Sequence, residues 1–151
     1  MSGAGATPLF VDTGAFFASF VSNAPRHDQA RAVMDAIGDD RLHFRPLYTT
    51  NYALSELATL MLRKAGHERA SATLSWIRDS DAVTILHPDA TTFGAICAAF
   101  DRYDDQQISF VDHATATLAR EHDVEHVFAF DDDFRTLGLS LVPADIDVSD
   151  V

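Results

Sequence analysis

The sequence predicts an α/β fold with a parallel central sheet covered by helices on both faces. Short apolar runs, typical of strands buried on both sides, alternate along the chain with longer segments of helical spacing. Alternation of this kind implies parallel strands joined by right-handed crossovers. The length of 151 residues suits one compact domain. We expect a flexible arm at 1–7, a single domain at 8–142 and an acidic tail at 143–151.

The expected strands are short and apolar. The first is the run PLFVD, and the others are expected at 47–50, 83–86, 127–130 and 139–142. The expected helices lie at 14–21, 27–38, 51–66, 67–78, 90–103 and 109–121, and a short helical turn precedes Gly138.

Composition excludes several classes of protein. Eleven basic and 23 acidic residues give a formal charge of −12, which disfavours nonspecific binding to nucleic acid or anionic lipid. The single cysteine, Cys97, excludes an intramolecular disulfide, and its apolar surroundings (GAICAAF) predict a buried thiol. We find no signal-peptide pattern and no run of 18 apolar residues, so we expect a cytoplasmic protein.

Two acids follow expected strands. Asp12 comes directly after the first strand, and Asp131 comes directly after the fourth. Because ligands of open parallel sheets bind beyond the carboxyl ends of the strands, both are candidates for a site. Each also has a structural alternative, since Asp12 can cap the following helix and Asp131 can be a turn residue.

Two further acids lie in helices. Glu56 sits in YALSELATLML, a helix that looks apolar on nearly every side, with no cation at i±3 or i±4. Either Glu56 points out of the helix layer, or an arginine or a metal ion meets it from elsewhere. Asp112 lies three residues after Ser109, a spacing that equally suits a capping box.

The four acids Asp12, Glu56, Asp112 and Asp131 are expected to converge, and we call them the acidic quartet. Two like charges about 4 Å apart repel by roughly 4 kcal/mol at an effective dielectric near 20. Such a cluster needs protons, cations or a metal, and oxygen ligands suit Mg²⁺ or Mn²⁺.

At these residues the sequence resembles the PIN-domain nucleases, and within them the VapC-type toxins of toxin–antitoxin pairs. The matching segments are LFVDTGAFFA, TTNYALSEL, YDDQQISFVDHATATLA and FAFDDDF, which occur in the family's order over nearly the whole chain. The resemblance implies a three-layer α/β/α sandwich and places the family's metal-binding and catalytic acids on the quartet. Asp133 and Asp105 are additional metal-ligand candidates, and Thr13, Thr50 and Ser109 have implied supporting roles. The chain departs from the family at Ala129, where a hydroxyl is common, and at Asp132, where a basic residue is usual.

The function implied by the resemblance is a Mg²⁺- or Mn²⁺-dependent endoribonuclease, the toxin of a type II toxin–antitoxin pair. The implied partners are an RNA substrate, a cognate antitoxin and a second copy of the chain; no membrane is involved. A basic patch of Arg63, Lys64 and Arg69 is a candidate RNA contact, although it can equally be a solvated helix end. The alternatives are a non-catalytic PIN-like RNA-binding or assembly module, and a receiver domain, whose chemistry normally requires a lysine beside the acids.

Overall fold

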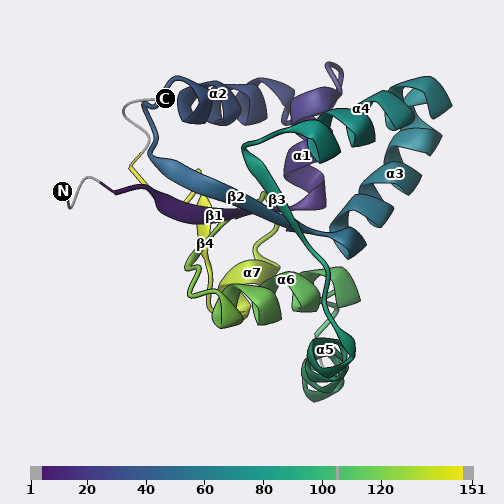
Figure 1. Cartoon of the computed structure of the whole chain (residues 1–151), viewed down its shortest axis with the longest axis vertical. Coiled ribbons are helices and arrows are strands. Elements are labelled where there is room, and N and C mark those ends of the chain that lie inside the picture. The colour runs from purple at the N-terminus through teal and green to yellow at the C-terminus, as the bar shows by residue number, and fades with distance from the viewer. Residues whose placement is uncertain (1–4, 105, 148–151) are drawn as a thin grey trace.

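The computed structural model describes residues 5–104 and 106–147 and shows a five-stranded parallel sheet (Figure 1). The spatial order of the strands is β3-β2-β1-β4-β5. The strands are β1 (Thr7–Val11), β2 (Phe44–Thr50), β3 (Val83–Leu86), β4 (His126–Phe128) and β5 (Ser140–Val142). The expectation of an all-parallel sheet is confirmed.

Helices cover both faces of the sheet (Figure 1). The helices α1 to α4 lie on one face, and α5 to α7 lie on the other, which confirms the three-layer arrangement. Their bounds are α1 (Thr13–Phe20), α2 (His27–Gly38), α3 (Asn51–Ala65), α4 (His67–Asp79), α5 (Ala90–Arg102), α6 (Phe110–Glu121) and α7 (Asp133–Thr136).

The side chains of the central strand β1 alternate between two hydrophobic cores, one on each face of the sheet. Leu9 and Val11 are buried in the core beneath α1 to α4, whereas Phe10 is buried in the core beneath α6 and α7. Successive side chains of a strand point to opposite faces, so a strand covered on both sides must be apolar at every position. This requirement explains the continuous apolar run that predicted the strand.

The strand order places a topological switch beside β1. The chain passes from β1 outward through β2 to β3, and then returns to the other side of β1 as β4. The crossovers after β1 and β4 therefore run on opposite faces of the sheet, and a crevice opens between their starting points. Asp12 directly follows β1 at this crevice, and Asp131 lies on the chain that leaves β4.

The strand boundaries differ from the sequence prediction most at β2 and β4. β2 begins at Phe44 rather than at residue 47. Its pairing with β1 shifts register around Pro46, so the strand can continue past a residue that has no backbone N–H to donate. β4 ends at Phe128, so Asp131 does not follow the strand directly. The Ala129 amide still bonds to the Val142 carbonyl at 3.2 Å before the chain leaves the sheet.

The prediction of a buried Cys97 is wrong, because this thiol is exposed on α5. Only Ile96 and Ala99 of α5 are buried, so the helix contacts the domain along a narrow stripe. The exposed side also carries Phe93 and Phe100, whose exposed fractions are 45% and 47%. An apolar composition alone could not show which face of this helix meets the domain.

The ends of the domain are more structured than a loose arm and tail. Thr7 is the first residue of β1, and Pro143 is buried directly after β5. Asp145 accepts a hydrogen bond from the Leu141 amide at 2.8 Å and pairs with Arg135 at 2.7 Å. The rest of the proposed arm and tail, at 1–4 and 148–151, lies outside the described residues. None of the described helices is long and apolar enough to cross a membrane.

Thr50 supplies a testable link between β2 and α3. Its hydroxyl accepts a hydrogen bond from the Ala53 amide at 3.0 Å and is fully buried. Thr50→Val should lower the free energy of unfolding by about 1 kcal/mol, because this amide has no partner within the helix. Thr50→Ser keeps the oxygen and is the matched control in urea denaturation. Equal stability of the valine and serine variants would show that the cap is not stabilising.

Candidate functional site

Asp12 connects β1 to α1 and serves both structural and site roles. Its carboxylate Oδ2 accepts a hydrogen bond from the Gly14 amide at 3.4 Å, so it is the N-cap of α1. The residue is only 8% exposed, because it lies at the crevice where β1 ends. The capping alternative and the site prediction therefore describe the same side chain.

Asp112 reaches the same region from the first turn of α6. Ser109 caps this helix, and its hydroxyl accepts a hydrogen bond from the Asp112 amide at 3.1 Å. Asp112 is 8% exposed. The cap orients the first turn of α6, and this turn presents the Asp112 carboxylate to the other acids.

Asp131 and Asp133 lie in the loop between β4 and α7. The Asp131 Oδ1 accepts a hydrogen bond from the Asp133 amide at 2.9 Å, which folds the loop back on itself. One carboxylate oxygen each from Asp112, Asp131 and Asp133 lie within 4.8 Å of one another. Asp133, expected as an additional candidate, therefore belongs to the tightest carboxylate group found among the described residues.

Burial, and after it the charges of neighbouring acids, raises the pKa values of three acids at this site. Burial and the nearby charges of Glu56 and Asp131 raise the pKa of Asp12 from 3.8 to about 7. Burial, followed by the charges of Asp12, Asp131 and Glu56, raises the pKa of Asp112 from 3.8 to about 7. Burial and the Asp131 charge also raise the pKa of Asp133. All members of the quartet thus lie within electrostatic range of each other.

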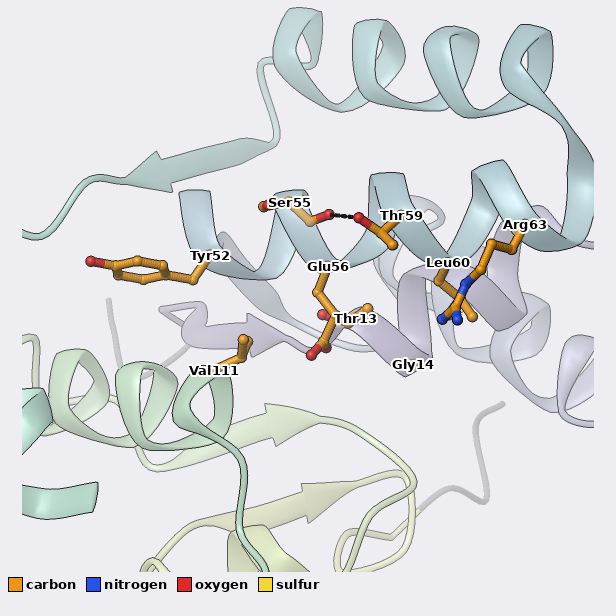
Figure 2. Close-up of a pocket in the computed structure, with 9 residues that line it drawn as sticks. All are labelled: Thr13, Gly14, Tyr52, Ser55, Glu56, Thr59, Leu60, Arg63 and Val111. Atoms are coloured by element: carbon orange, nitrogen blue, oxygen red, sulfur yellow. Dashed lines mark hydrogen bonds between the residues drawn. The ribbon is translucent and has the colours of Figure 1, made fainter. Parts of the chain in front are cut away.

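Glu56 points out of the α3 layer, which is the first of the two alternatives drawn from the sequence. The buried face of α3 consists of Ala53, Leu54, Leu57 and Met61, so the prediction of a helix apolar on nearly every side is wrong. Glu56 occupies the exposed side and is directed toward Thr13 of α1 (Figure 2). No ion pair between Glu56 and another residue is found in the described parts of the chain.

The three hydroxyl residues with expected supporting roles all fix the elements that carry the acids. Thr13 donates a hydrogen bond to the Ala53 carbonyl at 3.2 Å and so ties α1 to α3. Thr50 and Ser109 cap α3 and α6.

The two departures from the family pattern have different surroundings. Ala129 is buried in the core beneath α6 and α7. Asp132 is 84% exposed and pairs with Arg135 at 3.0 Å. The Arg135 guanidinium also binds Asp145 through three hydrogen bonds of 2.7 to 3.2 Å. The negative charge of Asp132 is therefore partly balanced by the guanidinium of Arg135.

An open cavity of about 630 Å³ lies along α3 and has Glu56 in its wall (Figure 2). We call it the α3 cavity, and its lining consists of Thr13, Gly14, Tyr52, Ser55, Glu56, Thr59, Leu60, Arg63 and Val111. The sequence analysis missed most of this lining. Tyr52, Thr59, Leu60 and Arg63 lie at i−4, i+3, i+4 and i+7 from Glu56, so helical spacing from that acid could have found them.

The three residues of the predicted basic patch have different surroundings. Arg63 lines the α3 cavity, whereas Lys64 is exposed outside it. Arg69 donates a hydrogen bond to the Phe20 carbonyl at 3.0 Å, so it links α4 to the end of α1. Asp105, the remaining metal-ligand candidate, lies outside the described residues.

The residues present fit a divalent cation. Oxygen donors converge from three separate segments, and burial disfavours the charged form of two of them. No arginine, lysine or histidine among the described residues pairs with these acids. A cation such as Mg²⁺ or Mn²⁺ is the counter-charge that such a donor set favours.

Comparisons with known proteins agree with this geometry. The family model described as PIN domain matches residues 9–139. The chain belongs to the PIN-domain family. It is 30% identical over 132 residues to the 23S rRNA-specific endonuclease VapC20 of Mycobacterium tuberculosis (strain CDC 1551 / Oshkosh), with 86% of this chain and 94% of that protein covered.

Solved structures of the PIN-domain family match the fold. The crystal structure of M. tuberculosis VapC20, a Sarcin-Ricin loop cleaving toxin, superimposes with a TM-score of 0.78 at 28% identity, covering 87% of this chain and 96% of that chain. VapBC2 from Rickettsia felis, bound to a DNA fragment from its promoter, matches with a TM-score of 0.64 at 12% identity, covering 89% and 97%. FitAcB from Neisseria gonorrhoeae matches with a TM-score of 0.60 at 16% identity, covering 88% and 95%. The chain is therefore a homologue of the VapC endonucleases of toxin–antitoxin systems.

The raised pKa values predict a pH-dependent response to metal. Asp12 and Asp112 hold protons more tightly when folded, so their contribution to stability is full below about pH 3.8 and is lost as the pH rises through about 7. A divalent cation must displace these protons. Mg²⁺ or Mn²⁺ should therefore raise the thermal unfolding temperature more at pH 8 than near pH 5.5.

The matched control for this measurement is Asp79→Asn, which removes an exposed acid at the end of α4. It should respond to Mn²⁺ as the wild-type chain does. The double variant Asp12→Asn with Asp112→Asn should lose the pH-dependent part of the response. A metal-induced shift that is equal at both pH values would contradict the assignment of these two acids.

Proposed function

We propose that this chain is a Mg²⁺- or Mn²⁺-dependent endoribonuclease and the toxin of a type II toxin–antitoxin pair. The observation that carries the proposal is the convergence of unpaired carboxylates from β1, α3, α6 and the β4–α7 loop at the switch point of the sheet. The relationship to VapC20, which is named as a 23S rRNA-specific endonuclease, supports this activity.

The proposed reaction is hydrolysis of a phosphodiester bond. Asp12, Asp112, Asp131 and Asp133 would hold the cation, and Glu56 would complete the anionic site. The bound cation supplies Lewis-acid stabilisation of the charge that develops on the scissile phosphate and favours a hydroxide nucleophile at neutral pH. The hydrogen bond from the Gly14 amide holds the Asp12 carboxylate, and the Ser109 cap fixes the backbone that carries Asp112, so the site is largely preorganised for the reaction.

An RNA substrate must approach a chain with a formal charge of −12. Neutralisation of the quartet by a divalent cation removes the strongest local repulsion, because like charges in a crevice act over a short distance at reduced dielectric. RNA binding to this chain is therefore expected to require metal. The residual negative charge disfavours nonspecific binding and leaves recognition to local contacts.

The negative charge of the chain also indicates what kind of antitoxin segment would bind it. An acidic crevice surrounded by an anionic surface suits a cationic segment, which would neutralise the acids and exclude the substrate. The relationship to VapC20, which is described as a Sarcin-Ricin loop cleaving toxin, supports a partner of this kind. We place the protein in the cytoplasm, where RNA is the available substrate.

A second copy of the chain is the proposed partner of α5. Phe93, Cys97 and Phe100 follow i, i+4 and i+7 spacing and form an exposed apolar stripe. Exposed apolar stripes of this kind mark association surfaces. We expect a homodimer that buries this stripe.

Cys97→Arg should convert the dimer to a monomer, because it places a charge at the centre of the stripe. Light scattering during size-exclusion chromatography gives the mass. Arg78→Ala, which changes an exposed residue of α4, is the control and should stay dimeric. A wild-type chain that elutes as a monomer at all concentrations would refute the homodimer.

The alternative of a non-catalytic PIN-like module gains no support from the site, since all four acids of the quartet are present and electrostatically coupled. The match to the PIN-domain family argues against the receiver-domain alternative. That alternative requires a lysine beside the acids, and Lys64 does not line the α3 cavity.

Asp12→Asn and Asp112→Asn should each reduce Mg²⁺-dependent RNA cleavage by about 100-fold or more, because each removes an anionic ligand of the cation. The measurement is cleavage of total RNA with sequencing of the product ends, with and without EDTA. Asp79→Asn is the control and should cleave as the wild-type chain does. Full activity of either site variant would remove that residue from the proposed site.

A further inference from the structure

The α3 cavity continues directly from the acidic quartet. Glu56 belongs to both, Thr13 follows Asp12 in the chain, and Val111 precedes Asp112. Three of the segments that supply the acids therefore also build the cavity wall. A polymer held at the quartet must extend along this wall or leave the surface.

Arg63 is the one cation among the residues that line the cavity. It lies seven residues after Glu56, which is about 10 Å along the helix axis at 1.5 Å per residue. Its guanidinium is directed toward the cavity side of α3 (Figure 2). Within residues 5–104 and 106–147, Arg63 has no ion pair or hydrogen bond, so its five donors are available to a ligand.

Tyr52 lies at the opposite end of the cavity, with Glu56 between it and Arg63 (Figure 2). Its ring packs edge-on against Phe110, with centroids 5.6 Å apart and planes at 83°. This contact supports the ring from one side, and the residue remains partly exposed. A supported aromatic ring is the surface on which a nucleobase stacks.

Along the cavity, an aromatic ring is followed by carboxylates and then by a cationic side chain. This order suits a single-stranded nucleic acid better than a peptide. A phosphodiester chain offers a base to Tyr52, one phosphate to the metal-bearing acids and a further phosphate to Arg63. Ser55 and Thr59 also line the cavity, and the Thr59 hydroxyl donates a hydrogen bond to the Ser55 carbonyl at 3.2 Å, so this stretch of the wall is polar. An acidic peptide would meet Arg63 but would be repelled by Glu56 and its neighbours.

We propose that the α3 cavity is the substrate track of this enzyme, in which Arg63 binds an RNA phosphate beside the scissile one and Tyr52 stacks a base on the other side. This inference rests on the proposed ribonuclease function and names the residues that select and orient its substrate. Because the two ends of the track differ, the RNA binds with one defined polarity.

The test measures RNA binding apart from cleavage. The probe is a fluorescein-labelled single-stranded RNA of random sequence, about 12 nucleotides long. Its dissociation constant is measured by anisotropy over a series of salt concentrations with the quartet intact, in Ca²⁺, an oxygen-ligated cation that replaces Mg²⁺ to limit cleavage. Arg63→Ala should weaken binding about tenfold and lower the salt slope by about 0.7, the value for one phosphate on a single strand. Arg63→Lys should restore the slope.

The controls separate this contact from general charge effects. Arg78→Ala removes the same charge from an exposed site on α4 and should leave the slope unchanged. Tyr52→Leu should weaken binding at least about fivefold without changing the slope, whereas Tyr52→Phe should bind as the tyrosine does.

Two outcomes would overturn the inference, and they are distinguishable. If the wild-type chain cleaves RNA but Arg63→Ala behaves as Arg78→Ala does, the ribonuclease function stands and the substrate track is wrong. The cavity would then belong to a protein partner. If the wild-type chain neither cleaves nor binds RNA with Mg²⁺, the function and the track fail together.

Discussion

Mutual repulsion among buried carboxylates is the constraint on which the rest of the site depends. Asp12 and Asp112 are held in low-dielectric surroundings close to Glu56 and Asp131, and each has a pKa of about 7 as a result. The fold does not relieve this repulsion with an arginine or lysine from its described residues. It therefore keeps the acids ready for a cation or a proton, at a cost in stability that the caps and core must offset.

Local hydrogen bonds hold most of the acids in position. Asp12 caps α1, the cap of α6 orients Asp112, and Asp131 closes its own loop through the Asp133 amide. Thr13 joins α1 to α3 and so relates Asp12 to Glu56. Because each side chain or its neighbour is fixed by a local hydrogen bond, the cluster is assembled before any ligand arrives.

The distribution of charge separates the site from the rest of the surface. Asp132 pairs with Arg135 at 3.0 Å, although its charge also helps to raise the pKa of Asp133. Arg135 in turn holds Asp145 just beyond β5. On α3, by contrast, Glu56 and Arg63 face the same cavity without pairing, two turns apart. A substrate with alternating phosphates and bases can use both.

The sequence by itself determined the alternating pattern, the parallel sheet and the identity of the four acids, because apolar runs and caps are local signals. The interaction of these acids was inferred from strand ends and family resemblance, and the raised pKa values of Asp12 and Asp112 agree with it. Only the tertiary structure decided which faces of α3 and α5 are exposed, and it placed Asp133 beside Asp112 and Asp131. It also separated Arg63 from Arg69. Helical composition shows that a face is apolar, but packing against distant segments decides whether that face is covered.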